Sequence, residues 1–181
     1  AIIQSRAQTG VEAPAVSVEV HLSNGLPSFT LVGLPEAAVR ESKDRVRSAL
    51  MTSGLDFPIR RITLNLAPAD LPKEGGRFDL AIALGLLCAG GQLAENCLDG
   101  FECIGELALS GEVRPIRGVL PAALATRAAK RQLIVPLANA EEASLASGLT
   151  IYAVEHLMQL VLHFLGQQPL QPYQSKGLIA A

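Results

Sequence analysis

The sequence predicts an α+β domain in which a mixed β-sheet is flanked by helices. Three observations support this fold class. Apolar residues alternate with polar ones in the first third of the chain, a glycine-containing loop leads into a long apolar segment after residue 77, and strands alternate with helices from residue 101 onward. Hydrophobic residues make up 49% of the 181 residues and charged residues 18%, so the chain can bury a sizeable core.

Strands are predicted where apolar and polar residues alternate, or where short apolar runs are bounded by turn residues. These segments are residues 2–7, 15–33 (a hairpin), 60–68, 101–116 (two short strands), 132–136 and 149–154. The hairpin rests on the alternating valines at its start and on Asn24-Gly25, a pair that is typical of tight turns. The two short strands are expected to join through Ser110-Gly111.

Helices are predicted between these strands. They cover residues 35–54, about 77–89, 119–132, 140–146 and 156–166. Pro35 is expected to start the first helix and Gly54 to cap its end. The apolar run from Phe78 to Leu87 is long enough to form a buried helix. Residues 1–166 are therefore expected to form one domain, with the polar, proline-containing residues 167–181 as a linker or tail.

The composition argues against several classes of function. A net charge of −2 provides no overall basic field for nucleic acid or for a membrane surface, so such binding would need a local patch. Three cysteines without a CxxC pair, and three scattered histidines, favour neither disulfides nor a metal site. Since no signal peptide or membrane-length apolar run occurs, the sequence predicts a soluble cytoplasmic protein.

The segment PKEGGRFDLAIALGLL, residues 72–87, is the first candidate site. Gly75 and Gly76 would let backbone N–H groups converge at a helix N-terminus, and Lys73 and Arg77 would add positive charge, so the loop is a candidate anion-binding site. The alternative is structural: the glycines only turn the chain, and Arg77 bonds to a neighbouring backbone carbonyl or to Asp79.

A basic patch on the first helix is the second candidate site. Cations recur there at spacings of three and four and are joined by one from the following strand: Arg40, Lys43, Arg47 and Arg61. They could contact DNA phosphates or a protein partner. The alternative is a solvated helix face with intrahelical pairs such as Glu36–Arg40 and Glu41–Arg45.

Residues 72–87 resemble the nucleophile segment of Lon-type proteases, PKDGPSAG followed by an apolar helix. Residues 105–125 resemble the Lon segment around GEVLPIGGLKEK, which supplies a lysine base. Matched position by position, Arg77 stands in place of the serine and Leu120 in place of the lysine. The resemblance implies a ribosomal protein S5 domain 2-like fold that has lost both catalytic groups, and hence no catalysis by this chain.

A longer resemblance covers about residues 3–165. The segments 5–50 and 65–85 closely resemble the N-terminal domain of bacterial magnesium-chelatase-like ATPases of the ComM/YifB type. In that family an AAA+ domain with the phosphate-binding P-loop follows the Lon-like domain. This chain contains no GxxxxGK[ST] motif, so ATP and Mg²⁺ are expected only in an AAA+ domain beyond the tail.

The resemblance implies a non-catalytic accessory domain of a hexameric, ATP-driven helicase that promotes DNA branch migration in natural transformation and recombination. Its expected partners are its own AAA+ domain, neighbouring subunits of the ring and DNA, with no membrane. A chelatase motor is a variant of this hypothesis for which no residue of this chain speaks. The alternative is a Ser/Lys peptidase domain of a Lon-like ATP-dependent protease, which would need a substitute catalytic pair.

Overall fold

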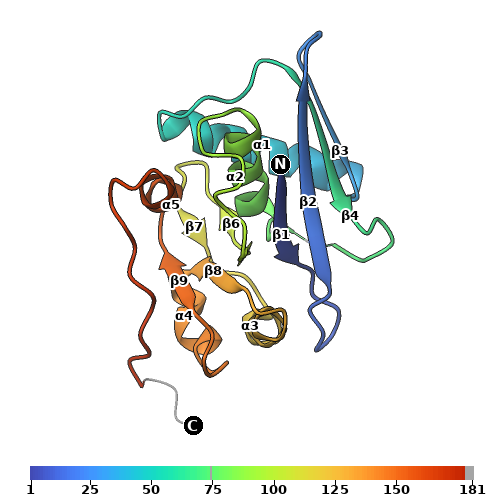
Figure 1. Cartoon of the computed structure of the whole chain (residues 1–181). Coiled ribbons are helices and arrows are strands. Elements are labelled where there is room, and N and C mark those ends of the chain that lie inside the picture. Colours follow the sequence, from blue (N-terminus) through green and yellow to red (C-terminus); the bar gives the residue numbers. More distant parts are fainter. Residues whose placement is uncertain (74, 178–181) are drawn as a thin grey trace.

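The computed structural model describes residues 1–73 and 75–177, and its central feature is a mixed β-sheet (Figure 1). Within these residues the sheet has seven strands in the order β3–β4–β2–β1–β5–β8–β9. Their bounds are β1 Ile2–Arg6, β2 Ala15–Ser23, β3 Ser28–Val32, β4 Arg61–Ala67, β5 Phe101–Cys103, β8 Gln132–Pro136 and β9 Ile151–Val154. The pairs β1–β2 and β2–β4 are antiparallel and the other four are parallel, which confirms the mixed sheet.

The hairpin predicted for residues 15–33 is wrong. β2 and β3 do not pair, because β4 lies between them, antiparallel to β2 and parallel to β3. Strands in a sheet are about 4.8 Å apart, so the loop at residues 24–27 crosses roughly 10 Å, which four residues can span. The inserted strand buries Ile62, Leu64 and Leu66 completely, and pairing on both sides satisfies its backbone.

The two strands predicted within residues 101–116 take a different form. β5 joins the main sheet, whereas β6 (Glu106–Leu107) and β7 (Val113–Arg114) form a separate antiparallel pair. The expected turn at Ser110-Gly111 connects β6 to β7. This short pair lies against the N-terminal end of α2, where the amide of Leu80 donates to the carbonyl of Gly105.

Helices cover the two faces of the sheet unequally. The helices are α1 Glu36–Thr52, α2 Asp79–Ala89, α3 Val119–Ala128, α4 Leu137–Ala143 and α5 Leu157–Phe164. Apolar side chains of α1, α2 and α5 share one hydrophobic cluster, and those of α3 and α4 share a second cluster with β8 and β9. The β5–β8–β9 half of the sheet is therefore covered on both faces, whereas the β2–β4 half is covered on one (Figure 1).

The side chains along each strand follow this division of the sheet into a half covered on both faces and a half covered on one. In β8, Leu133 and Val135 face α3 and α4 while Ile134 faces the other cluster. A continuous apolar run is the pattern expected for a strand covered on both faces. In β4, by contrast, the buried Leu64 is flanked by the exposed Thr63, which is the alternation that the sequence predicted.

Two helix boundaries differ from the prediction. α4 begins at Leu137, before the predicted start at residue 140. α3 ends at Ala128, and Lys130 adopts a left-handed backbone with φ of 59°. Of the basic residues near the end of the range predicted for this helix, Arg127 lies in α3, whereas Lys130 and Arg131 follow it because the chain has already turned toward β8.

A buried polar network lies between the two hydrophobic clusters. Arg6 at the end of β1 is 9% exposed and Glu102 in β5 is 1% exposed. The Arg6 Nε atom donates to Glu102 Oε1 at 2.7 Å and its Nη2 to Oε2 at 3.0 Å. Thr126 of α3 and Arg131 also donate to the Glu102 carboxylate, which therefore joins β1, β5 and α3.

Residues 167–177 follow α5 as an extended segment beside β9, here called the strap (Figure 1). The amide of Leu170 donates to His163 Nδ1 at 2.8 Å, and the amide of Tyr173 donates to the carbonyl of Ile151 at 2.7 Å. The Tyr173 hydroxyl donates to Glu141 Oε1 at 2.9 Å. The predicted tail is thus bound to the domain over its described part, and the boundary at 166 stays a prediction.

Candidate functional site

The two glycines of the loop before α2 answer different local requirements. Gly75 has φ of 59°, a left-handed conformation that favours glycine. Gly76 has no room for a side chain, because a Cβ atom there would lie 2.6 Å from Glu106 Cγ and 2.8 Å from Asp79 Oδ2. The loop therefore presses directly against β6 and the first turn of α2.

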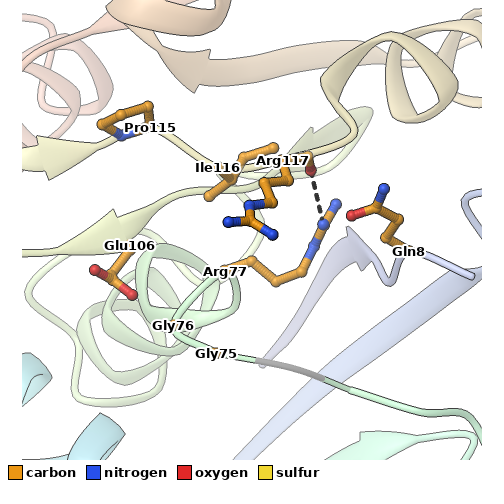
Figure 2. Close-up of a pocket in the computed structure, with 8 residues that line it drawn as sticks. All are labelled: Gln8, Gly75, Gly76, Arg77, Glu106, Pro115, Ile116 and Arg117. Carbon is orange, nitrogen blue, oxygen red and sulfur yellow. Dashed lines mark hydrogen bonds between the residues drawn. The ribbon is translucent and has the colours of Figure 1, made fainter.

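Arg77 is the residue that this loop places at the centre of the site. It is 7% exposed, with its Nε donating to the carbonyl of Arg6 at 2.9 Å and its Nη1 to the carbonyl of Arg117 at 3.0 Å. Figure 2 shows the side chain reaching toward Arg117 and Gln8, away from Glu106. Its Nη2 atom is buried and has no partner among the described residues. Burial lowers the pKa of Arg77 from its ordinary value.

Asp79, the other partner considered for Arg77, forms its hydrogen bonds with different residues. Its carboxylate is fully buried and accepts from Arg45 Nε at 2.6 Å, from Ser42 Oγ at 2.7 Å and from the amide of Leu107 at 3.1 Å. Burial raises the pKa of Asp79, and these donors oppose that shift. The hydrogen bond between Arg45 and Asp79 also raises the pKa of Arg45. Of the two structural partners considered for Arg77, the backbone carbonyl is therefore the one observed.

A pocket of about 290 Å³ opens beside Arg77 (Figure 2). Its lining comes from three distant segments of the chain: Gln8, Gly75, Gly76, Arg77, Glu106, Pro115, Ile116 and Arg117. The two segments that resemble Lon therefore meet at one place. Leu120 belongs to the second of these segments and lies in the first turn of α3, whose N-terminal cap is Gly118 in a left-handed conformation.

Among the described residues, the lining carries two guanidinium groups and one carboxylate but neither a hydroxyl group nor an amine. A Ser/Lys mechanism needs a hydroxyl nucleophile with an amine in hydrogen-bond reach, and this pocket offers neither. The two guanidinium groups of the pocket suit a hydrogen-bonded anion better than a covalent intermediate, although the Glu106 carboxylate would repel such an anion.

Lys73 does not join the other candidate residues of the loop. Its Nζ donates to the carbonyl of Pro68 at 2.6 Å and to that of Leu71 at 3.2 Å. It lines a separate hollow near the start of α1, together with Gly33. Burial lowers the pKa of Lys73, and nearby Asp70 opposes this shift. An anion-binding role for the loop stays a prediction, and the structure places Lys73 outside the pocket at Arg77.

Two members of the basic patch lie over aromatic rings. Lys43 Nζ is 5.6 Å from the ring centroid of Phe29, and Arg47 Cζ is 5.9 Å from that of Phe57. Both rings belong to a cleft that Arg40 and Arg61 do not line. The proposed contact with DNA or a partner stays a prediction, while the structure adds the aromatic rings and Arg60 to the patch.

The alternative pairings on α1 are realised in part. Arg45 Nη1 lies 4.0 Å from Glu41 Oε2, although the closer partner of Arg45 is Asp79. Over the described ranges no ion pair joins Glu36 to Arg40.

Sequence reasoning missed Gln8, Glu106 and Arg117 at the pocket, and Phe29 and Phe57 at the basic patch. The first three come from segments far from the loop in sequence. The signal that could have revealed the aromatic rings is the run Phe57-Pro58-Ile59-Arg60, which combines an aromatic, apolar residues and a cation next to the basic strand β4.

No cluster of three or more potential metal-binding side chains occurs in the part of the chain that the structure describes. Within that part, none of the helices has the length and apolar character needed to cross a membrane.

Comparison with known proteins gives a family match and several relatives. Residues 18–139 match the family described as subunit ChlI of Mg-chelatase. The competence protein ComM of Haemophilus influenzae is 56% identical over 170 residues, which cover 94% of this chain and 33% of that protein. The uncharacterized protein YifB of Salmonella typhimurium is 48% identical over 171 residues, 94% of this chain and 34% of that protein.

More distant similarity extends to proteases. A Lon protease of Brevibacillus choshinensis is 28% identical over 177 residues, which cover 91% of this chain and 22% of that protein. The chain spans about a third of the length of the ComM and YifB proteins that it matches.

Proposed function

The chain belongs to the ChlI family of magnesium-chelatase-like proteins, and from this membership we propose that it is a non-catalytic, Lon-like accessory domain of an AAA+ ATPase. The whole protein would be a ComM-type helicase that drives DNA branch migration in natural transformation and recombination. This domain would serve subunit assembly and contact with DNA. Its fold would be of the ribosomal protein S5 domain 2-like class.

The proposal that the domain is non-catalytic rests on the hydrogen bonding of Arg77. In the position that the Lon resemblance assigns to the nucleophile, its guanidinium bonds to the carbonyls of Arg6 and Arg117. The side chain thereby ties β1 to the segment before α3. A residue bound in this way supports the scaffold and leaves no group to attack a peptide bond.

ATP and Mg²⁺ would be held by the AAA+ domain that follows in the longer protein. This chain has no P-loop, so its own residues provide no phosphate cradle of that kind. Its partners would be that AAA+ domain and neighbouring subunits of a hexameric ring. The strap would give such an assembly a fixed connection, because hydrogen bonds hold it against β9 and α4 as far as Lys176.

The first test is hydrolysis of fluorescent casein and of a short fluorogenic peptide by this chain, with an active Lon protease as the positive control. We expect no hydrolysis, with or without ATP. Hydrolysis that disappears when a serine of this chain is changed to alanine would instead establish the Ser/Lys peptidase alternative.

Assembly is tested on the longer protein by native mass spectrometry and by its DNA-stimulated ATPase activity, with and without residues 1–166. We expect removal of the domain to weaken the ring and to lower the stimulation by DNA. An intact ring with full stimulation would contradict the accessory role.

A further inference from the structure

The basic patch on α1 borders a cleft with an apolar floor. The cleft lies between α1 and the start of β3 and β4, and has a volume of about 220 Å³. Its principal residues are Phe29, Lys43, Arg47, Phe57, Ile59 and Arg60. The two phenyl rings are stacked, with centroids 6.3 Å apart and an interplanar angle of 25°. This site is separate from the pocket at Arg77, with which it shares no residue.

Among the described residues, the cations around this cleft have no carboxylate partner within 4.0 Å. Lys43, Arg47 and Arg60 form no ion pair within 4.0 Å and no side-chain hydrogen bond in the described ranges. The neighbouring acids in sequence, Asp44 and Asp56, are exposed and take part in no ion pair there. The rim of the cleft therefore has uncompensated positive charge, and the contacts of Lys43 and Arg47 with the rings keep that charge at the apolar floor.

The cleft and its adjoining loop also expose apolar surface. Ile59 is 85% exposed, and Leu26 on the adjoining loop is 84% exposed. The cleft is smaller than the roughly 300–1,000 Å³ of pockets for drug-sized molecules, so it suits one flat group at a time. Its ligand should combine a flat apolar group with neighbouring negative charges.

We propose that this cleft binds single-stranded nucleic acid, with a base against Phe57 and Ile59 and the flanking phosphates on Lys43, Arg47 and Arg60. Single strands present both features together, since each base offers a π face and each link a phosphate. In a duplex the bases are stacked inside, so only the cations would find partners. The inference deepens the DNA contact of the proposed function and rests on it.

The test is fluorescence anisotropy of this chain with a labelled oligo-dT of about 20 nucleotides, with a duplex of the same length and with a poly-glutamate peptide. Arg47→Gln removes one rim cation, and Ile59→Ser removes exposed apolar surface. Phe57→Leu keeps apolar volume and removes the π face. The matched control is Arg127→Gln, an exposed cation on α3 at the other face of the sheet.

We expect the chain to bind oligo-dT more tightly than the duplex or the peptide. Phe57→Leu should weaken oligo-dT binding about fivefold or more, within the range known for base–aromatic stacking, and leave duplex binding unchanged. Arg47→Gln should reduce the slope of log K against log salt by about 0.7, the value for one phosphate contact with a single strand. Ile59→Ser should weaken oligo-dT binding in the same direction as Phe57→Leu, and Arg127→Gln should change nothing.

Equal affinity for single strand and duplex with no effect of Ile59→Ser would overturn the inference, as would effective competition by poly-glutamate. An absence of binding at low salt would also overturn it. Because Ile59 is exposed, its variant stays informative even if Phe57→Leu impairs folding. The proposed function fails separately, through peptide hydrolysis or an intact ring without residues 1–166, and neither result depends on these variants.

Discussion

Arg77 joins separate parts of the domain through one buried side chain. Its backbone lies in the turn before α2, where a side chain can reach two other segments. The carbonyls that it contacts belong to Arg6 at the end of β1 and to Arg117 before α3. A serine there would be too short to make either bond, so the coupling of these three parts of the domain depends on the long arginine side chain.

Replacing Arg77 by methionine should therefore destabilise the domain. The change removes the donors for the carbonyls of Arg6 and Arg117, and each buried polar group left unpaired costs about 1–3 kcal/mol. We expect the free energy of unfolding to fall by roughly 2–4 kcal/mol in urea denaturation. Arg40→Met is the control, since Arg40 is exposed, and should stay within about 0.5 kcal/mol. Equal stability of both variants would show that Arg77 is not a structural tie.

The two glycines of the loop should differ in their tolerance of a side chain. Gly76→Ala would place a methyl group against Glu106 and the fixed carboxylate of Asp79, at an expected cost of about 1–3 kcal/mol. Gly75→Asn meets open space, and asparagine adopts a left-handed backbone more readily than most residues, so it should cost less than about 1 kcal/mol. Thermal unfolding of both variants measures the difference, and a larger loss for Gly75→Asn would contradict the packing described for Gly76.

At the scale of elements, a histidine of α5 holds the start of the strap through a hydrogen bond to Leu170. Burial lowers the pKa of His163 below its ordinary value of 6.5, and its neutral Nδ1 accepts the Leu170 amide. A group whose folded pKa is depressed in this way contributes stability above pH 6.5, and that contribution is lost as the pH falls through 6.5 toward the folded pKa.

We therefore expect the strap to loosen between about pH 7.5 and pH 5.5. Amide hydrogen exchange at Leu170 and Tyr173, corrected for intrinsic rates, should show lower protection at the acidic value. His163→Gln should abolish the pH response, whereas His21→Gln, on the exposed side of β2, should preserve it. Unchanged protection across this range would rule out control of the strap by His163.

How far the elements follow from the sequence depends on how local their causes are. α2 was predictable because its apolar run is continuous, and the helix is buried throughout Asp79–Cys88. The alternation in β2 and β4 was equally informative. The strand order was not predictable from the sequence. Asn24-Gly25 indicates a turn but does not determine which strand pairs with β2, and β4, from residues 61–67, takes that place.

The candidate site was predictable only in part for the same reason. Gly75, Gly76 and Arg77 are adjacent in sequence and mark the loop. The partners of Arg77 are backbone carbonyls, which every residue has, so no side-chain pattern points to Arg6 or Arg117. Contacts of this kind depend on how β1 and α3 approach α2, which is settled only by the packing of the whole domain.

At the scale of the molecule, the buried network around Glu102 joins the halves that the two hydrophobic clusters form. Glu102→Gln should remove the charge that compensates the buried Arg6 and lower the free energy of unfolding by about 3–5 kcal/mol. Arg131→Gln, which removes a more exposed partner, should cost less than about 1 kcal/mol. Urea denaturation of the two variants provides the comparison, and losses of similar size would argue against a central role for Glu102.

The two edges of the sheet have different consequences for association. The strap occupies the outer side of β9, where Tyr173 donates to Ile151, while β3 has β4 as its sheet neighbour among the described strands. Exposed edges are where copies of a chain can add strand to strand. If two copies joined β3 to β3, both outer ends of the joint sheet would be closed by straps. Strand addition would then stop at a pair and could not continue into a fibre.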